Sequence, residues 1–374
     1  MKKNILIADD SALLRRVMRD IIEEDGTYTV SDMCRNGLEA YELIKTKKYD
    51  AVILDIVMPK MTGLELLERL KKEGIKATVI VASTLTTSSN SAETLRALEL
   101  DAVDFIAKPT NLIEARGEDF RSSLLNILNS VLASKDNDKI VFPENAVTRS
   151  ATHNLKEAVR NVKEEQIAAK KKMSEHLGSK AEKKLVALAC STGGPKALNV
   201  LMPMLSANLD APVLIVQHMP EGFTKLLSEK LNNISKITVK EAEHGEIIKK
   251  GHVYIAPGGK HMMLTKAEGN NHRIKISDEP PRDALKPCAD IMYESLNTCN
   301  FDEITCVVLT GMGSDGTKGI NQLCKNKNVY VISQDAQSCV VYGMPKAIYE
   351  SGIVDEVVSL ENVASAITRN VGVK

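Results

Sequence analysis

Short apolar runs alternate with amphipathic segments through the first 120 or so residues of the chain. Each run has the length of a buried strand, and each following segment repeats its apolar positions with the period of a helix. The expected strands are 4–8, 51–54, 78–82 and 102–106, and the expected helices are 11–24, 64–72 and 92–100. This alternation is typical of an α/β fold in which helices cover a parallel sheet.

The same alternation of apolar runs and amphipathic segments begins again at Leu185 and continues to the end of the chain. The expected strands here are 185–190, 212–216, 253–256, 305–309 and 329–332, with a helix over 196–205. Between the two halves large apolar residues become sparse, and no strand pattern is visible. We therefore expect an α/β domain over 1–120, a partly helical linker over 121–183, and a second, doubly wound α/β domain over 184–374.

Composition narrows the classes of function. The 374 residues carry 49 basic and 49 acidic side chains, so no global field attracts nucleic acid. Seven scattered cysteines without metal-ligand spacing argue against zinc. There is neither a signal-peptide pattern nor an apolar stretch of the ~20 residues that a membrane span needs. We expect a cytoplasmic protein that does not insert into a membrane.

Charged residues follow several of the expected strands in the first half. Asp9 and Asp10 follow the first strand, Asp55 ends another, and Lys108 comes after the last. Because parallel strands bring their carboxyl ends to one edge of the sheet, these side chains can share a pocket. Mg²⁺ would relieve the repulsion between the carboxylates, and an aspartate there could accept a phosphoryl group. The alternative is that these are ordinary solvated loop residues.

Ser191 stands where an apolar run breaks into Thr192-Gly193-Gly194-Pro195 before a helical pattern. Backbone N–H groups at a helix start favour negative charge, either of a phosphate or of a developing oxyanion. His218 and Asp315 follow two other expected strands, and a glycine-rich turn spans 311–316. Ser191, His218 and Asp315 could thus form a nucleophile, a base and an orienting acid. A phosphate cradle remains the other possibility, although no dinucleotide or P-loop fingerprint surrounds the turn.

The first half resembles the receiver domain of two-component response regulators. The matching motifs are Asp9-Asp10, Asp55-Ile56-Val57-Met58-Pro59, Ser83-Thr84 and Lys108-Pro109. The resemblance implies that Asp55 is phosphorylated and that Asp9, Asp10, Asp55 and the Val57 carbonyl hold Mg²⁺. It also implies that Ser83 is the switch hydroxyl and that Lys108 binds the phosphate. Thr62 departs from the pattern, because many receivers carry aspartate there.

The second half resembles the catalytic domain of the chemotaxis methylesterase CheB family. The matching motifs are Ser191-Thr192-Gly193-Gly194-Pro195, Gln217-His218-Met219-Pro220, 310–316 and Tyr342-Gly343-Met344-Pro345. The resemblance implies a catalytic triad of Ser191, His218 and Asp315. It implies that the Met312 backbone stabilises the oxyanion, that Thr192 and Gly194 shape the pocket, and that this domain uses no cofactor. Cys190 departs from the family, as does the segment 282–290.

Together the two resemblances imply a phosphorylation-activated enzyme of chemotactic adaptation. It would hydrolyse glutamate γ-methyl esters on methylated chemoreceptors, deamidate receptor glutamines, and take its phosphoryl group from the chemotaxis histidine kinase. A response regulator with a non-catalytic nucleotide- or partner-binding second domain is the alternative. A DNA-binding regulator is disfavoured, because the second half lacks a basic recognition helix.

Overall fold

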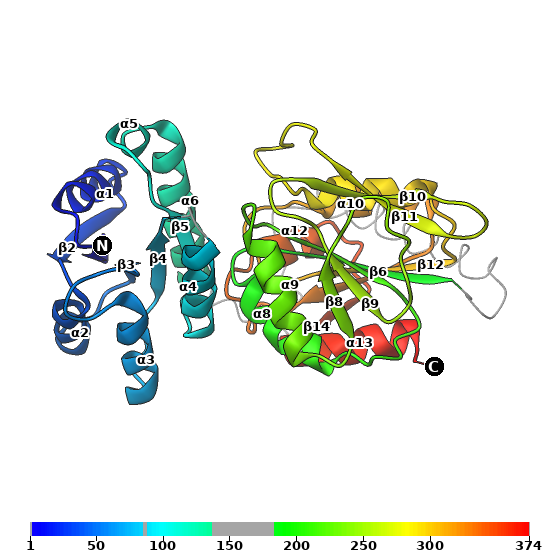
Figure 1. The fold of residues 1–374 in the computed structure, drawn as a ribbon, viewed down its shortest axis with the longest axis horizontal. Helices are drawn as coiled ribbons and strands as arrows, with labels where there is room; N and C mark the ends of the chain where they lie inside the picture. Colours follow the sequence, from blue (N-terminus) through cyan, green and yellow to red (C-terminus); the bar gives the residue numbers. More distant parts are fainter. Residues whose placement is uncertain (1, 85–87, 137–182, 374) are drawn as a thin grey trace, which may run out of the picture. The chain divides into compact units, whose positions relative to one another are not determined.

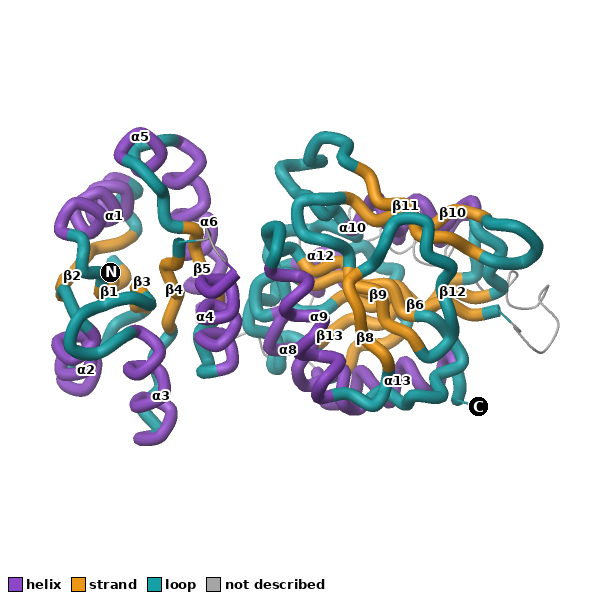
Figure 2. The backbone as a smooth tube through the Cα atoms, viewed as in Figure 1, coloured by secondary structure: helices purple, strands orange, loops and turns teal. Residues whose placement is uncertain are grey.

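The computed structural model of the chain describes residues 2–84, 88–136 and 183–373. The chain divides into two compact units, residues 1–137 and 138–374. In each unit a sheet lies inside a covering of helices (Figure 1, Figure 2). The expected α/β class with a parallel sheet in each half is confirmed.

The first unit is built on a five-stranded parallel sheet of order β2-β1-β3-β4-β5. Its strands are β1 (Lys3–Ala8), β2 (Tyr28–Cys34), β3 (Ala51–Asp55), β4 (Val79–Ser83) and β5 (Asp104–Ala107). Its helices are α1 (Ala12–Glu24), α2 (Gly37–Thr46), α3 (Gly63–Glu73), α4 (Ser88–Glu99), α5 (Leu112–Ala115) and α6 (Glu118–Asp136). This strand order is that of flavodoxin-like folds, whose ligands bind where the order reverses, between β1 and β3.

Local sequence signals set the starts of two helices beside that reversal. The Ser11 side chain accepts a hydrogen bond from the Leu14 N–H and caps α1. Thr62 and Glu65 form a reciprocal capping box at the start of α3. The next residue, Gly63, has no space for a side chain, since a Cβ there would lie 2.3 Å from the Asp55 carbonyl oxygen. Thr62, the departure from the receiver pattern, therefore serves as a helix cap.

The first unit extends beyond the boundary expected near residue 120. Helix α6 buries Leu124, Leu128 and Leu132, and the Lys3 ammonium donates to the Leu132 carbonyl at 2.7 Å. The burial of this apolar face is what keeps α6 with the first unit, whose limit falls at residue 137. The start of the expected linker, 121–136, is thus part of the first unit. The rest of it, 137–182, lies outside the described residues.

The second unit contains a seven-stranded parallel sheet of order β14-β13-β12-β6-β7-β9-β8 and a separate hairpin, β10-β11. The strands are β6 (Lys184–Cys190), β7 (Val213–Gln217), β8 (Thr238–Glu241), β9 (His252–Ile255), β10 (His261–Lys266), β11 (His272–Ser277), β12 (Glu303–Val308), β13 (Val329–Gln334) and β14 (Glu356–Val358). The helices are α8 (Gly194–Leu201), α9 (Phe223–Ile234), α10 (Ala289–Ser295), α11 (Thr317–Asn326), α12 (Met344–Glu350) and α13 (Leu360–Val371). The strand order reverses at β6, which pairs with β7 on one side and β12 on the other.

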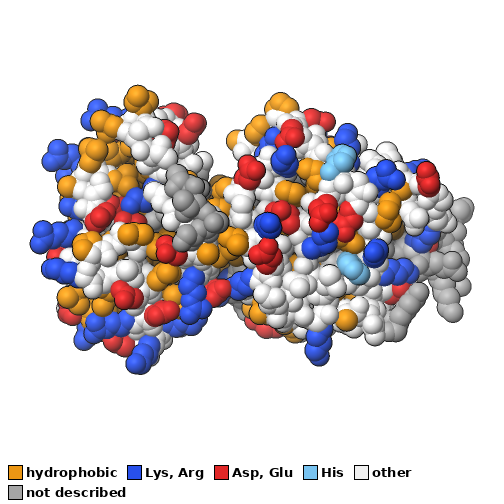
Figure 3. Space-filling model, viewed as in Figure 1, with side chains coloured by type: hydrophobic (Ala, Val, Ile, Leu, Met, Phe, Trp, Pro, Cys, Tyr) orange, Lys and Arg blue, Asp and Glu red, His pale blue; other side chains and the backbone are white. Residues whose placement is uncertain are grey.

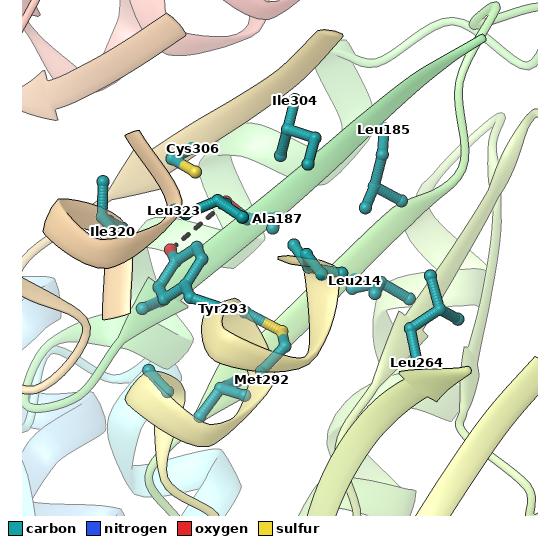
Figure 4. Close-up of a cluster of buried hydrophobic side chains, with 14 of the residues drawn as sticks. Leu185, Ala187, Leu214, Leu264, Met292, Tyr293, Ile304, Cys306, Ile320 and Leu323 are labelled. Carbon is teal, nitrogen blue, oxygen red and sulfur yellow. Dashed lines mark hydrogen bonds between the residues drawn. The ribbon is translucent and has the colours of Figure 1, made fainter. Parts of the chain in front are cut away.

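The core of the second unit lies between this sheet and α10 (Figure 4). Tyr293 of α10 is fully buried, and its hydroxyl lies 3.3 Å from the Ala187 carbonyl and 3.2 Å from the Val307 carbonyl. A buried tyrosine hydroxyl needs such a partner. These contacts hold α10 against β6 and β12, the strands that precede Ser191 and the loop of Asp315.

Acidic and basic side chains are both present on the face drawn in Figure 3. Among the helices within residues 2–84, 88–136 and 183–373, none has the length and apolar composition that crossing a bilayer requires.

Candidate functional sites

An ion-paired cluster lies at the carboxyl edge of the first sheet. Asp9 directly follows β1, Asp55 ends β3, and Lys108 directly follows β5. The Lys108 ammonium lies 2.8 Å from Asp9 Oδ2 and 2.9 Å from Asp55 Oδ2. Asp9 is completely buried and Asp55 nearly so, hence the lysine compensates charges that have little contact with water.

The surroundings oppose full ionisation of Asp55. Burial raises the pKa of its carboxyl to about 6, the charge of Asp9 adds to this rise, and Lys108 counteracts it. Burial alone would lower the pKa of the Lys108 ammonium, but the charges of Asp9 and Asp55 outweigh burial and raise it. The single positive charge of Lys108 therefore does not fully compensate the carboxylates of this cluster.

The three carboxylates have the donors that a hard divalent cation prefers. Asp9, Asp10 and Asp55 each offer an oxygen, and these oxygens lie within 4.8 Å of one another. An all-oxygen set with one exposed member, Asp10, fits Mg²⁺, which keeps several waters when it binds to proteins. The Val57 N–H donates to Asp55 Oδ1 at 3.3 Å, so the backbone at Val57 borders the cluster.

A cavity of about 170 Å³ opens beside the carboxylates. Its lining includes Asp10, Asp55, Val57, Ser83 and Lys108. Five of the residues singled out in the sequence thus meet around one small space that is open to solvent. Asp9, the sixth, reaches the same group through its ion pair with Lys108.

Ser83 has a partner that the sequence analysis missed. The Thr94 hydroxyl of α4 lies 2.8 Å from the Ser83 hydroxyl and 2.8 Å from the Asn90 carbonyl oxygen. Thr94 is completely buried. No motif marks this residue, and the only sequence signal is a polar side chain on the apolar face of an expected helix. The bond links the end of β4 to α4.

The second group of residues lies at the carboxyl edge of the second sheet. Ser191 directly follows β6 and His218 directly follows β7, while Asp315 lies in the loop after β12. These strands are neighbours in the sheet, with β6 between the other two. The Ser191 N–H donates to the Thr310 carbonyl at 3.0 Å, and the His218 N–H donates to the Cys190 carbonyl at 3.2 Å. The three loops are therefore tied together through their backbones.

His218 and Asp315 are in direct contact. His218 Nε2 lies 2.8 Å from Asp315 Oδ2. Because an ionised carboxylate only accepts hydrogen bonds, Nε2 carries a proton, and Nδ1 is the ring nitrogen that can act as a base. Within the described residues no hydrogen bond joins Ser191 to His218. Such catalytic bonds often tighten only when substrate binds.

The Asp315 carboxylate is held in its ionised form. Burial opposes ionisation, but His218 and the N–H groups of Ala289 and Asp290 outweigh burial and lower the pKa of Asp315 to about 2. The donor distances are 2.6 Å from Ala289 and 2.9 Å from Asp290, and the Cys288 thiol lies 3.2 Å away. Ala289 and Asp290 open α10, so their N–H groups point outward from a helix start. Sequence reasoning did not find this set, although it had noted that segment 282–290 departs from the family.

The loop after β12 passes very close to the serine. At Gly311 an added Cβ would lie 2.8 Å from Ser191 Cβ and 2.4 Å from Met344 Sδ, so only glycine fits. Met312, the expected oxyanion residue, follows directly and is 39% exposed. On the other side, Thr192 is buried, and the Gly194 N–H donates to the Ser191 carbonyl at 2.7 Å. Met312, Thr192 and Gly194 thus all surround Ser191.

The residue before the serine is buried and inert. Cys190 has no exposed surface, and burial raises the pKa of its thiol far above the ordinary value. It therefore remains a neutral thiol, and its sulfur lies 3.0 Å from Gln217 Oε1. A neutral buried thiol is a poor nucleophile.

Comparisons with known proteins agree with this division into two sites. A family model described as CheB methylesterase matches residues 186–367, and one described as response regulator receiver domain matches residues 5–116. A protein-glutamate methylesterase/protein-glutamine glutaminase of Halalkalibacterium halodurans is 39% identical over 365 residues, which are 98% of this chain and 97% of the relative. The chain belongs to the protein-glutamate methylesterase/protein-glutamine glutaminase family.

Two further proteins that are similar to this chain are also methylesterases by name. A family member of Desulfotalea psychrophila is 38% identical over 98% of both chains. The CheB methylesterase catalytic domain of Thermotoga maritima is 38% identical, with a TM-score of 0.49, and the match covers 50% of this chain and 99% of that domain. The prediction of an enzyme of the methylesterase class, fused to a receiver in a chemotaxis response regulator, is confirmed.

Proposed function

We propose that this chain is a phosphorylation-activated hydrolase of glutamate γ-methyl esters on chemoreceptors that also deamidates receptor glutamines. Ser191 is the nucleophile, His218 is the general base, and Asp315 orients the histidine. The observation that carries the proposal is the 2.8 Å contact between His218 and an ionised, buried Asp315, one strand away from Ser191. The family assignment supports the two substrates.

The first half-reaction acylates the serine. Ser191 Oγ bonds to the γ-carbonyl carbon while its proton moves to His218 Nδ1, and the Asp315 carboxylate stabilises the resulting imidazolium. Backbone N–H groups near Met312 stabilise the oxyanion. The carbon–methoxy bond then breaks, the leaving oxygen takes the proton from His218, and methanol departs. A glutamine amide loses ammonia by the same path.

The second half-reaction releases the serine. A water molecule attacks the acyl carbon and passes its proton to His218, and Ser191 Oγ leaves with a proton from the same histidine. The product is a glutamate side chain. Apart from the attacking water, these steps use only Ser191, His218, Asp315 and the surrounding backbone.

In the receiver, an Asp55 carboxylate oxygen bonds to phosphorus as the bond from phosphorus to the phosphohistidine nitrogen of the chemotaxis kinase breaks. Mg²⁺ held by Asp9, Asp10, Asp55 and the Val57 carbonyl would, when bound, offset charge on the phosphoryl oxygens. Lys108 pairs with the phosphoryl group formed next to it, and the Ser83 hydroxyl donates to it. These contacts shift the receiver between two states and so raise the activity of the esterase.

The proposal is tested by the rate of methanol release from methyl-esterified receptors in membranes. Ser191→Ala is expected to reduce the rate to background, whereas Cys190→Ser, which removes the sulfur but keeps a donor for Gln217 Oε1, retains activity. Equal rates for the wild type and Ser191→Ala would instead favour a non-catalytic binding domain. Loss of activity in Cys190→Ser but not in Ser191→Ala would show that Ser191 is not the nucleophile.

A further inference from the structure

A buried amide lies beneath the nucleophile and the base and contacts both. Gln217 is the last residue of β7 and pairs in register with Cys190 of β6. Its side chain is 1% exposed. One nitrogen, Nε2, donates to the Ser191 carbonyl at 3.0 Å and to the His218 carbonyl at 3.1 Å. A single planar group thus links the residues that must exchange a proton.

The amide has only one favourable orientation. Its oxygen faces the Cys190 sulfur at 3.0 Å, and Cys190 remains a protonated thiol that can donate. Rotation by 180° would turn the oxygen toward two carbonyl oxygens and the NH₂ group toward the thiol. The two oxygen–oxygen contacts would be unfavourable, and the buried NH₂ group would be left with only a weakly accepting sulfur. The two N–H groups therefore stay on the Ser191 and His218 carbonyls.

The space around this amide is closed. A Cβ at Gly194 would lie 1.9 Å from Gln217 Oε1 and 3.1 Å from the Cys190 sulfur, so the turn after Ser191 presses directly on the amide. The Ser191 carbonyl accepts from Gly194 N–H as well as from Gln217. Movement of the amide would therefore move the serine backbone.

We propose that Gln217 is a positioning residue that holds Ser191 and His218 at the separation needed for proton transfer. This inference rests on the proposed function, since it concerns the same triad. Gln217 is buried below the loops and bonds to backbone carbonyls, so it acts through Ser191 and His218. Its removal should therefore lower kcat and leave KM nearly unchanged, because a small misplacement of reacting groups costs rate.

The test uses the full chain with Gln217→Met, which keeps the length of the side chain and removes both donors. We expect kcat for methanol release to fall by about 30-fold or more, with KM within about twofold. Labelling of Ser191 by a fluorophosphonate, which needs the same proton transfer, should slow in parallel. Should the methionine variant fail to fold, as judged by circular dichroism, Gln217→Glu takes its place, with the same shape, no N–H donor and the same expectation.

Thr305→Val is the matched control. It removes one partly buried hydrogen bond, which Asn370 of α13 donates to the Thr305 hydroxyl near the start of β12, where no residue of the proposed triad lies. Its kcat and labelling rate should stay within about twofold of the wild type. A kcat within about threefold of wild type for a folded Gln217 variant, or an equal loss in Thr305→Val, overturns the inference. Wild-type activity that is insensitive to Ser191→Ala would instead overturn the proposed function.

Discussion

Asp315 shows how a single carboxylate can be kept charged inside a protein. Its two oxygens accept hydrogen bonds from the backbone at Ala289, Asp290 and Gly316, and from His218. This set of donors more than offsets the burial that would otherwise raise the pKa. In the proposed mechanism this charge stabilises the imidazolium that forms on His218 during the reaction.

Replacement of Asp315 by asparagine should therefore abolish most activity. An amide in this place cannot stabilise the imidazolium and favours the wrong histidine tautomer, so we expect kcat to fall by about 10³- to 10⁴-fold with KM little changed. Asp290→Asn is the control, since Asp290 is a buried neighbour that accepts from the Gly319 N–H at 2.7 Å, a bond that asparagine can keep. Steady-state methanol release measures both variants. A similar loss in the two would mean that local charge, not contact with His218, matters.

The low pKa of Asp315 also predicts how stability depends on pH. In the folded protein the pKa falls from its ordinary 3.8 to about 2. The folded state therefore favours the ionised form, and this contribution is complete above about pH 4 and lost as pH falls through 2. It amounts to about 2 kcal/mol in the free energy of unfolding.

Chemical denaturation at a series of pH values, followed by circular dichroism, measures this contribution. The stability difference between wild type and Asp315→Asn should shrink by about 2 kcal/mol between pH 5 and pH 2. A difference that does not change with pH would contradict the lowered pKa.

At the residue scale, the sequence reveals groups that follow strands but conceals what surrounds them. Ser191 and His218 are visible as polar residues close to the ends of apolar runs, and the parallel sheet then brings them to one edge. Cys288 and Thr94 could not be found this way, and Gln217 is visible after the same apolar run as His218 but without a sign of its role. Their partners lie in other elements, so their roles depend on strand register and helix packing that no local pattern records.

At the scale of elements, the bond between Ser83 and Thr94 connects β4 to α4. A threonine hydroxyl has one proton, and here two acceptors compete for it, the Ser83 oxygen and the Asn90 carbonyl. If Ser83 turns toward a phosphoryl group on Asp55, the Thr94 hydroxyl can donate its hydrogen bond to the Asn90 carbonyl instead. Phosphorylation of Asp55 would thereby change the hydrogen bonds of α4.

Thr94→Val should uncouple these two elements, because it keeps the shape of the side chain and removes its hydroxyl. We expect stimulation of the esterase by a phosphodonor to fall by about threefold or more, while the activity without phosphodonor is unchanged. Thr94→Ser, which restores a hydroxyl, should recover the response. Full stimulation of the valine variant at equal phosphorylation would exclude this route.

The long apolar strands were predictable, whereas the short and mixed ones were not. Strand β6 is a continuous apolar run, but β14 has three residues, and in β11 buried His272 and Ile274 alternate with charged side chains. Pairing with a neighbour, which is not local, makes these segments strands. Helix α6 was assigned in part to a linker because its role is evident only from the surface that it buries.

At the scale of the whole molecule, the same architectural rule serves two chemistries. Each unit has a parallel sheet, and each candidate site lies at the carboxyl edge where the strand order reverses, between β1 and β3 in the first unit and around β6 in the second. Alternating strands and helices were enough to predict both sheets. The proposed dependence of the esterase site on the receiver site can be measured on the full chain.

Methanol release from methyl-esterified receptor membranes, with and without acetyl phosphate as phosphodonor, tests the account most directly. The wild type should release methanol at a basal rate that rises about tenfold or more with the phosphodonor, within the range of allosteric effects. Asp55→Asn should keep the basal rate without the rise, and Ser191→Ala should show neither. Stimulation that persists in Asp55→Asn, or methanol release that persists in Ser191→Ala, would contradict it.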